Sequence, residues 1–436
     1  MTTREIIAAP GPVCGSIRPP GSRSITNRAL IVAALADGTS HIEEVGLSDD
    51  TRVCAEALRA LGLEITVNEA NRTMRVKGCG GCVPEGPKEI NTGDSGTATR
   101  FMTALVAAGA GRYRIDGSAR MRERPIQDLL DGLKALGVEA ECQWGTGCPP
   151  VLLDTSGLAG GKVHVGGAVS SQYLSGLLMA APAASAPVII EVAGELVSKP
   201  YVDMTLAVMR DFGVEVRREG YARFEVPAPA KYRARRYAVE PDASSASYFM
   251  AAAAATGGRV TVEGLTRDST QGDAHFPDIL RAMGCEVSWS ERGVTVAAPQ
   301  PPAHLAGVQI DLSAMPDMVL TLAPLAVFAW GRTAIRNVAN LRVKESDRLE
   351  ALATELARLG AKVEQHPDGL TIYPPEAIQP AEVATYNDHR MAMGMAIIGL
   401  RVPGIRIAGA ECVSKTYPEF FEDLERLASV AHGPKD

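Results

Sequence analysis

Six short polar clusters stand immediately before apolar stretches of the chain. They are Ser22-Arg23-Ser24, Asp94-Ser95-Gly96-Thr97, Ser170-Ser171-Gln172, Asp242-Ala243-Ser244-Ser245, Asp317 and Asn387-Asp388-His389-Arg390. Ser, Asp and Asn are the residue types that cap helix N-termini. A helix N-terminus also attracts anions, because its free backbone N–H groups and its positive dipole end point at the same place. The clusters therefore predict either simple caps or a set of anion-binding helix ends.

Basic residues accompany these clusters. They are Arg23, Arg28, Arg100, Arg124, Lys344, Arg348, Arg390 and Lys415. A lone arginine is usually a solvated surface residue. Eight cations beside serine and glycine clusters, in a chain of formal net charge -7, instead indicate small ligands that carry several negative charges. The acidic balance argues against a nucleic-acid partner, which usually requires an excess of Lys and Arg on one face.

The apolar stretches after the clusters must form buried helices. They span 28–38, 100–111, 173–185, 247–258, 318–331 and 390–400, and they are apolar on nearly all sides. If the buried helices of one domain run parallel, their N-termini meet on one face. The polar clusters would then form a shared site.

A second series of helices alternates with the first. Five amphipathic segments, such as LRALGLEI and LKALGVEA, end in Gly62, Gly137, Gly213, Gly284 and Gly360, with steps of 75, 76, 71 and 76 residues. Glycine after the last apolar residue is the expected helix C-cap, and a β-rich run follows it. The chain thus contains six repeats, each with one buried helix, one surface helix and about four strands.

One repeat cannot enclose its own buried helix, so several must pack around a shared axis. We predict an α/β protein of two domains, each of three repeated β/α units around buried parallel helices. One domain would span 21–241 and the other 1–20 with 242–436. Two chain crossings between them suggest a hinge, with the active site in the interdomain cleft.

Metal and membrane signals are weak in this sequence. Cys79 and Cys82 have zinc-like spacing, but no second CxxC or paired-His motif accompanies them, so we expect no metal. The N-terminus resembles no signal or transit peptide, and the apolar stretch 318–330 is too short to cross a bilayer. Eight scattered cysteines favour a reducing compartment. We expect a cytoplasmic protein with no membrane or nucleic-acid partner.

Nine motifs, in order along the whole chain, resemble the 5-enolpyruvylshikimate-3-phosphate synthase family. They are PPGSRSITNRAL (19–30), GDSGTATRF (93–101), RMRERPIQDL (120–129), VSSQY (169–173), LVSKPYVDMT (196–205), DASSASYF (242–249), LRVKESDRL (341–349), YNDHRMAM (386–393) and SKTYP (414–418). The resemblance implies a two-domain enolpyruvyl transferase fold, no metal or organic cofactor, and transfer of the enolpyruvyl group of phosphoenolpyruvate to the 5-hydroxyl of shikimate 3-phosphate. The reaction would pass through addition and then elimination of phosphate. We expect a monomer.

The resemblance also implies residue roles. The implied shikimate 3-phosphate ligands are Arg23, Ser24, Arg28, Ser170, Ser171, Gln172, Ser198, Tyr201, Asp317, Asn340 and Lys344. The implied phosphoenolpyruvate ligands are Arg23, Asp94, Gly96, Arg124, Gln172, Arg348, Arg390 and Lys415. Asp317, Lys344 and Glu345 resemble the acid/base groups, with Asp317 the favoured base and Glu345 the favoured acid at carbon. The chain departs from the common family pattern at Arg23, Asp94 and Phe101, where Lys, Asn and Pro or Leu are usual.

Two alternatives stay open at this point. A sister enzyme that transfers enolpyruvyl to UDP-N-acetylglucosamine shares the fold, but its family carries a loop cysteine that the stretch 118–125 lacks. A relative of RNA 3'-phosphate cyclases, or a non-catalytic anion-binding protein, is the more distant alternative. A cyclase would need a histidine nucleophile, and His389 is the only histidine that lies in a motif.

Overall fold

The chain divides into two compact units. The computed structural model describes residues 2–167, 170–299 and 304–429. Residues 21–239 form one unit, here the continuous unit, and residues 1–20 with 240–436 form the other, here the split unit. The chain passes between them after Pro20 and after Val239. The sequence-based division placed the second crossing after residue 241.

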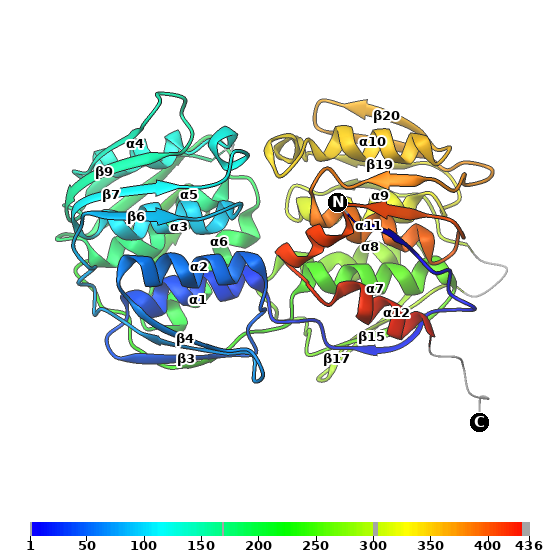
Figure 1. Cartoon of the computed structure of the whole chain (residues 1–436), viewed down its shortest axis with the longest axis horizontal. Coiled ribbons are helices and arrows are strands. Elements are labelled where there is room, and N and C mark those ends of the chain that lie inside the picture. Colours follow the sequence, from blue (N-terminus) through cyan, green and yellow to red (C-terminus); the bar gives the residue numbers. More distant parts are fainter. Residues whose placement is uncertain (1, 168–169, 300–303, 430–436) are drawn as a thin grey trace. The chain divides into compact units, whose positions relative to one another are not determined.

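The continuous unit is built from three βαβαββ repeats (Figure 1). Its helices are α1 (Arg23–Leu35), α2 (Asp49–Leu61), α3 (Gly96–Ala107), α4 (Gln127–Ala135), α5 (Ser171–Ala180) and α6 (Lys199–Asp211). Its strands are β3 (Thr39–Glu43), β4 (Glu64–Asn68), β5 (Thr73–Lys77), β6 (Lys88–Asn91), β7 (Ala110–Asp116), β8 (Glu139–Cys142), β9 (Val151–Ser156), β10 (Gly161–Gly166), β11 (Val188–Ala193), β12 (Arg217–Glu219), β13 (Arg223–Val226) and β14 (Arg236–Ala238). They form sheets of order β14-β3-β5-β4, β6-β7-β9-β8 and β10-β11-β13-β12.

The split unit repeats this plan. Its helices are α7 (Ala243–Thr256), α8 (Phe276–Ala282), α9 (Val319–Ala326), α10 (Arg348–Arg358), α11 (His389–Gly399) and α12 (Phe420–Ser429). Its strands are β1 (Thr3–Glu5), β2 (Cys14–Ile17), β15 (Arg259–Glu263), β16 (Glu286–Ser290), β17 (Gly293–Ala297), β18 (Gln309–Asp311), β19 (Thr333–Arg336), β20 (Lys362–His366), β21 (Gly369–Tyr373), β22 (Glu382–Ala384) and β23 (Arg406–Ala408). Four 3₁₀ turns also matter below: η3 (Gly272–His275), η4 (Pro316–Met318), η5 (Ala339–Val343) and η6 (Ala410–Lys415). The sheets have the orders β16-β17-β15-β2, β18-β19-β21-β20 and β1-β23-β22.

Near the two crossings, strands join sheets whose other strands lie far away along the chain. β14, at the end of the continuous unit, pairs in parallel with β3 of the first repeat. β2, from the N-terminal segment, pairs in parallel with β15 of the fourth repeat, and β1 pairs antiparallel with β23 of the sixth. In the described residues the sixth sheet has three strands, where the repeat pattern predicts about four.

All six predicted apolar stretches contain buried helices, namely α1, α3, α5, α7, α9 and α11. The surface helices begin or end as the glycine pattern predicts. Gly62, Gly137, Gly213, Gly284 and Gly360 all adopt the left-handed backbone conformation that favours glycine. The surface helices α2, α4 and α10 each bury an apolar face and expose the opposite face to solvent, so they cover the buried helices.

Glycines allow two pairs of buried helices to approach closely. A Cβ on Gly394 of α11 would lie 1.9 Å from the Leu320 carbonyl oxygen of α9. A Cβ on Gly176, the same position of α5, would lie 3.2 Å from the Ala104 Cβ and 3.3 Å from the Arg100 carbonyl oxygen of α3. The approach is therefore much tighter in the split unit.

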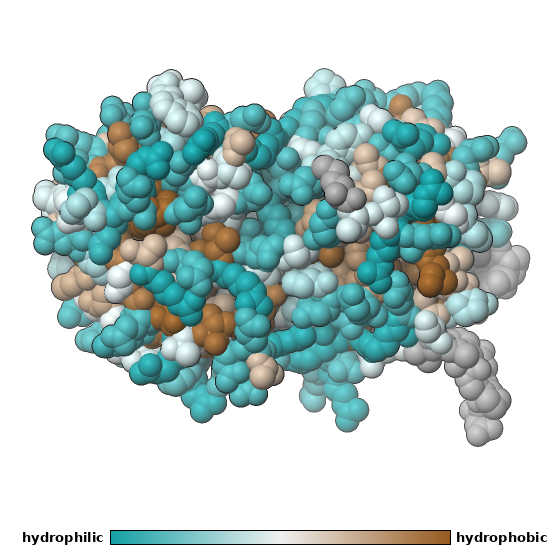
Figure 2. Space-filling view, in the orientation of Figure 1, coloured by the Kyte–Doolittle hydropathy of each residue, from teal (hydrophilic) through white to brown (hydrophobic). Residues whose placement is uncertain are grey.

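Figure 2 shows one face of the molecule, on which hydrophilic side chains predominate and apolar groups are small and scattered. In the described part of the chain, no helix is both long and apolar enough to cross a membrane.

Candidate active site

Asp317 is the centre of a connected set of charged side chains in the split unit. Its Oδ1 accepts a hydrogen bond from Arg348 Nη1 at 2.8 Å, and its Oδ2 lies 2.8 Å from Arg390 Nη2. Arg348 Nη2 lies 3.0 Å from Glu345 Oε2, and Lys415 Nζ lies 3.0 Å from Glu345 Oε1. The five residues come from four segments that are far apart in the sequence, because only Glu345 and Arg348 are neighbours along the chain. Together with Asp388, described next, they are called the Asp317 network.

Asp388 holds the two arginines of the Asp317 network. Its Oδ2 accepts from Arg348 Nε at 2.7 Å, and its Oδ1 accepts from Arg348 Nη2 at 3.2 Å. Its Oδ1 also accepts from the Arg390 backbone N–H at 3.0 Å, which caps the N-terminus of α11. A carboxylate that binds a guanidinium through two bonds fixes its plane as well as its position. Asp388 is fully buried, so this geometry is rigid.

Local structure explains why these side chains meet. Asp347 caps α10 by accepting from the Glu350 N–H, which places Arg348 at the first position of that helix. Asp317 lies in η4, directly before α9, and the N-cap residue of α9 is Met318 rather than Asp317. Ser22, Ser95, Ser170, Asp242 and Asp388 do cap the helices that follow them. Asp317 is thus the cluster residue that the capping explanation does not cover.

The carboxylates of the Asp317 network favour the charged form of Arg348. Burial alone would lower the pKa of the Arg348 guanidinium, but Asp388, Glu345 and Asp317 outweigh it and raise that pKa above its usual value. The side chains of Asp317 and Glu345 are 13% exposed and that of Lys415 is 14% exposed. Three acidic groups and three basic groups therefore share one largely desolvated site that a small ligand can still reach.

The carboxyl group of Asp273 is connected to Arg390 through Ser244. Arg390 Nη2 donates to Ser244 Oγ at 3.3 Å, and the Ser244 hydroxyl donates to Asp273 Oδ2. Burial, and next the charge of Asp317, raise the pKa of Asp273 from 3.8 to about 6. Asp273 is therefore linked to Arg390 through the Ser244 hydroxyl.

Asn340 and Lys344 lie next to the Asp317 network along the chain. Asn340 is in η5, which contacts η4, and Lys344 immediately follows η5. Both side chains are half-buried. The structure thus places Asn340 on a turn that contacts the Asp317 turn, and Lys344 directly before Glu345.

In the continuous unit, Arg28 is turned inward. Its Nε donates to Thr205 Oγ1 at 2.7 Å, and its Nη2 donates to the Tyr201 carbonyl at 3.1 Å and to Ser175 Oγ at 3.5 Å. Its guanidinium also lies 5.3 Å from the Phe101 ring centroid. Burial lowers the pKa of Arg28 to about 10. The structure therefore gives Arg28 a role in joining α1 to α5 and α6, in addition to the predicted one.

Arg23 pairs with a buried carboxylate. Its Nη1 lies 2.5 Å from Asp50 Oδ2, at the start of α2. The Arg23 side chain is 15% exposed, and Ser24 beside it is half-buried. The Asp50 contact orients a guanidinium at the position where the sequence predicts contact with both substrates.

Gly96 is covered by guanidinium groups. A Cβ on Gly96 would lie 2.7 Å and 2.8 Å from the two terminal nitrogens of Arg124, and 2.9 Å from Arg100 Nη1. Arg100 Nη2 donates to the Pro125 carbonyl at 2.6 Å, and Tyr173 Oη donates to the same oxygen at 2.7 Å. These bonds hold the residue after Arg124. Glycine at 96 is therefore required for Arg124 to approach the N-terminus of α3.

The remaining predicted residues lie at the starts of α3, α5 and α6. Ser170 Oγ accepts from the Gln172 N–H at 3.3 Å, and Gln172 Nε2 donates to Thr97 Oγ1 at 3.1 Å. The Ser118 hydroxyl donates to Asp94 Oδ1. Ser171 and Ser198 are buried, Tyr201 is half-buried, and Ser198 has a left-handed backbone with φ of 55°. Such strain in a non-glycine residue is concentrated at functional sites.

The structure thus brings the predicted residues together in two sets. One set is the Asp317 network with its neighbours Asn340 and Lys344, and the other lies around the starts of α1, α3, α5 and α6. Sequence reasoning assigned no role to Asp50 or Asp273, and it treated Asp388 only as part of a cluster that caps a helix or forms an anion-binding helix end. The spacing of Asp388 from Arg390, at the start of a buried helix, was the one available signal for it.

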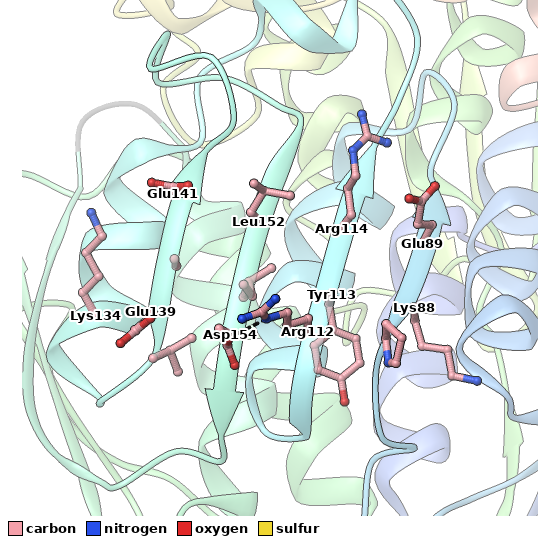
Figure 3. Close-up of a pocket in the computed structure, with 14 residues that line it drawn as sticks. Lys88, Glu89, Arg112, Tyr113, Arg114, Lys134, Glu139, Glu141, Leu152 and Asp154 are labelled. Atoms are coloured by element: carbon pink, nitrogen blue, oxygen red, sulfur yellow. Dashed lines mark hydrogen bonds and ion pairs between the residues drawn. The ribbon is translucent and has the colours of Figure 1, made fainter.

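A separate pocket of about 1010 Å³ lies over the sheet β6-β7-β9-β8. Figure 3 shows its charged lining, including Arg112, which pairs with Asp154 at 2.9 Å. Among the described residues that line it, none is a predicted ligand. Within 2–167, 170–299 and 304–429, no group of three or more His, Cys, Asp and Glu side chains could hold a metal ion. Cys79 and Cys82 are free thiols.

Comparisons with known proteins agree with this geometry. Residues 7–424 match the family EPSP synthase (3-phosphoshikimate 1-carboxyvinyltransferase). The chain is 45% identical over 439 residues to the chloroplastic 3-phosphoshikimate 1-carboxyvinyltransferase of Petunia hybrida, covering 97% of this chain and 85% of that protein. It is 46% identical over 421 residues to the Nostoc punctiforme protein of the same activity, covering 97% and 98%. A solved EPSP synthase from Acinetobacter baumannii superposes with a TM-score of 0.82 at 26% identity, covering 98% of both chains.

The six repeats in two units place the chain among the two-domain enolpyruvyl transferase folds. Within that class, the chain belongs to the EPSP synthase family. The sequence-based predictions of family, fold class and enzymatic nature are confirmed. The UDP-sugar alternative is not favoured.

Proposed function

We propose that this enzyme transfers the enolpyruvyl group of phosphoenolpyruvate to the 5-hydroxyl of shikimate 3-phosphate and releases inorganic phosphate. Membership of the family supports the reaction. The observation that carries the residue assignment is the Asp317 network, in which one carboxylate is bound by Arg348 and Arg390 and a second, Glu345, is bound by Lys415.

The cations of the Asp317 network suit phosphoenolpyruvate. That substrate carries a phosphate and a carboxylate, and planar guanidinium groups bind both bidentately. Arg348, Arg390 and Lys415 of the split unit, with Arg124 and the Gly96 backbone of the continuous unit, would neutralise its charge. Arg23, Asp94 and Gln172 complete the proposed phosphoenolpyruvate site.

Shikimate 3-phosphate would contact the starts of α1, α5 and α6. Ser24, Ser170, Ser171, Ser198 and Arg28 offer hydroxyls and a cation for its phosphate and carboxylate. Gln172, Tyr201, Asn340 and Lys344 would surround the ring, with Arg23 between the two substrates. Each unit thus carries part of the proposed ligand set.

Asp317 and Glu345 divide the proton transfers. As the 5-hydroxyl oxygen bonds to C2 of phosphoenolpyruvate, Asp317 takes the hydroxyl proton and Glu345 gives a proton to the methylene carbon. In the second step a proton leaves the new methyl group, the C2–O bond to phosphate breaks, and the double bond forms again. Lys344 would help in these transfers. Fixed positive charge and positioning in a closed site supply much of the rate.

Several further properties belong to this proposal. The chemistry requires no cofactor, and the substrates are small molecules rather than nucleic acid or membrane. We propose that the enzyme acts as a monomer in the cytoplasm.

The direct test measures phosphate release from phosphoenolpyruvate. We expect release that depends on shikimate 3-phosphate and that a UDP-amino sugar cannot replace. Asp317→Ala should abolish turnover, because alanine cannot take the hydroxyl proton. The variant should leave the circular dichroism spectrum unchanged. Phosphate release without shikimate 3-phosphate would contradict the proposed acceptor. Near-normal turnover of Asp317→Ala would remove Asp317 from the mechanism.

A further inference from the structure

A strained turn precedes the residues that organise the Asp317 network. Tyr386 and Asn387 are consecutive non-glycine residues with φ of 55° and 56°. The Asp388 N–H donates to the Thr385 carbonyl at 2.8 Å, so the two residues are the centre of a four-residue turn. Positive φ at both central positions is the pattern of a type I′ turn, which favours Asn, Asp and Gly. A tyrosine at its first central position is unfavourable unless another contact supports it.

The support comes from helix α10. Tyr386 is 43% exposed, but its hydroxyl donates to Glu355 Oε1 at 2.8 Å, and Glu355 is fully buried. The backbone N–H of Ala384, just before the turn, donates to Glu355 Oε2 at 3.3 Å. Arg358 neutralises the carboxylate, with Nε 3.0 Å from Oε2. Burial, and next the bond to Glu355, raise the pKa of Tyr386 to about 12, so the phenol stays a donor at working pH.

The same helix also holds the other end of the turn. Arg348, seven residues before Glu355, lies on the same face of α10 and binds Asp388 through two hydrogen bonds. The turn is therefore fixed to α10 at Tyr386 and at Asp388. Thr385 adds a third attachment, because its Oγ1 donates to the Ala408 carbonyl at 2.8 Å.

We infer that Tyr386 and Glu355 are positioning residues for the anion-binding arginines: their hydrogen bond keeps the 385–388 turn left-handed and thereby aims Asp388 at Arg348 and Arg390. Neither residue touches the reacting atoms in this scheme. The inference rests on the proposed function in one respect, namely that Arg348 and Arg390 bind phosphoenolpyruvate. It goes beyond that function because it assigns the orientation of the arginines to the hydrogen bond between Tyr386 and Glu355, two residues that are not proposed ligands.

Two substitutions separate the hydrogen bond from the backbone preference. Tyr386→Phe removes only the hydroxyl. Tyr386→Asn also removes it but supplies a residue that accepts positive φ readily. The matched control is Tyr373→Phe, because the Tyr373 hydroxyl also donates to a glutamate, Glu364, at 3.1 Å in the same unit but on the β20–β21 hairpin.

The experiment measures kcat, the KM of each substrate and the midpoint of thermal unfolding for the full-length enzyme. Tyr386→Phe is expected to raise the KM of phosphoenolpyruvate by about five- to tenfold, and that of shikimate 3-phosphate by less than about twofold. Tyr386→Asn, which accepts the left-handed backbone without the hydroxyl, is expected to raise the KM of phosphoenolpyruvate by less than about twofold. Tyr373→Phe is expected to leave both KM values unchanged. A merely structural role would lower the unfolding midpoint and move both KM values together, and that result would overturn the inference.

A fourth variant, Arg390→Gln, separates this inference from the proposed function. If Arg390→Gln raises the KM of phosphoenolpyruvate while Tyr386→Phe does not, the positioning role is wrong and the proposed function stands. If Arg390→Gln leaves that KM unchanged, the assignment of Arg390 fails and the positioning inference fails with it. A rise in the KM of phosphoenolpyruvate for Tyr386→Asn as large as that for Tyr386→Phe would show that the left-handed turn does not aim Asp388, and would also overturn the inference.

Discussion

At the scale of single residues, the site is organised by buried carboxylates that orient its cations. Asp388 orients Arg348 and Arg390, Asp50 orients Arg23, and Asp273 supports Arg390 through Ser244. A cation that must bind a ligand is useful only when its own conformational freedom has been removed beforehand. The buried acids perform that task in this enzyme.

Asp273 should make the stability of the enzyme depend on pH. Its pKa in the folded protein, raised to about 6 by burial and next by Asp317, exceeds its ordinary value of 3.8. The folded state therefore binds this proton more tightly than the unfolded state does. The resulting stabilisation is complete below about pH 4 and is lost as the pH rises through about 6.

Asp273→Asn removes this titration but keeps an acceptor for Ser244. We expect the variant to gain stability relative to the parent between pH 4 and 7, by up to about 3 kcal/mol. Urea unfolding at several pH values checks this. The control is Asp268→Asn, at an exposed aspartate of the same unit. A difference between Asp273→Asn and the parent that does not change with pH would show that Asp273 is charged throughout.

The residues that sequence reasoning found and missed differ in a physical way. Arg348, Arg390, Lys415 and Glu345 stand in recognisable motifs, and the structure joins them to Asp317. The partner of each buried carboxylate, by contrast, lies far away along the chain: 27 residues separate Arg23 from Asp50, and 40 separate Arg348 from Asp388. A pairing of that kind depends on packing and leaves no local pattern.

At the scale of elements, the repeat could be predicted from the sequence because each copy contains the same two kinds of helix. Apolar residues on all sides identified the buried helices, and the left-handed glycines marked the ends of the amphipathic ones. The pairing of β14 with β3 could not be predicted from the sequence. β14 is three residues long and pairs with β3 nearly two hundred residues away, so neither length nor alternation distinguishes it from a loop.

Helix spacing should be the most sensitive feature of the split unit. Gly394→Ala places a methyl group 1.9 Å from the Leu320 carbonyl oxygen, which can be relieved only if α9 and α11 separate. We expect a loss of about 3 kcal/mol or more in the free energy of unfolding. Gly176→Ala is the matched substitution in the continuous unit, and contacts of 3.2 Å and 3.3 Å predict a smaller loss, about 1 kcal/mol.

Denaturant unfolding of both variants decides the point. Equal losses would mean that the tight approach of α9 to α11 relaxes at little cost. A larger loss for Gly176→Ala would contradict the packing argument outright.

At the scale of the whole molecule, the division of labour between the units has a mechanistic consequence. The continuous unit carries Arg23, Arg124 and the serines at the starts of α5 and α6, and the split unit carries the Asp317 network. Neither unit contains all the proposed shikimate 3-phosphate ligands together with the acid/base pair. Two chain crossings, after Pro20 and after Val239, connect the units, and so few connections permit a hinge. The proposed function therefore predicts that the ligands draw the units together when they bind.

Small-angle X-ray scattering tests this prediction. A compact chain of 436 residues has a radius of gyration of about 22 Å, and the free enzyme should exceed that value if its units are apart. An equilibrium mixture of saturating substrates and products keeps the site occupied, and we expect the radius of gyration to fall toward about 22 Å in it. The same mixture should have a smaller effect on Arg390→Gln, because that variant lacks a cation that the proposed closure uses. A radius of gyration that ligands do not change would mean that the units are held at one separation, and the two ligand sets would then have to meet without any closure.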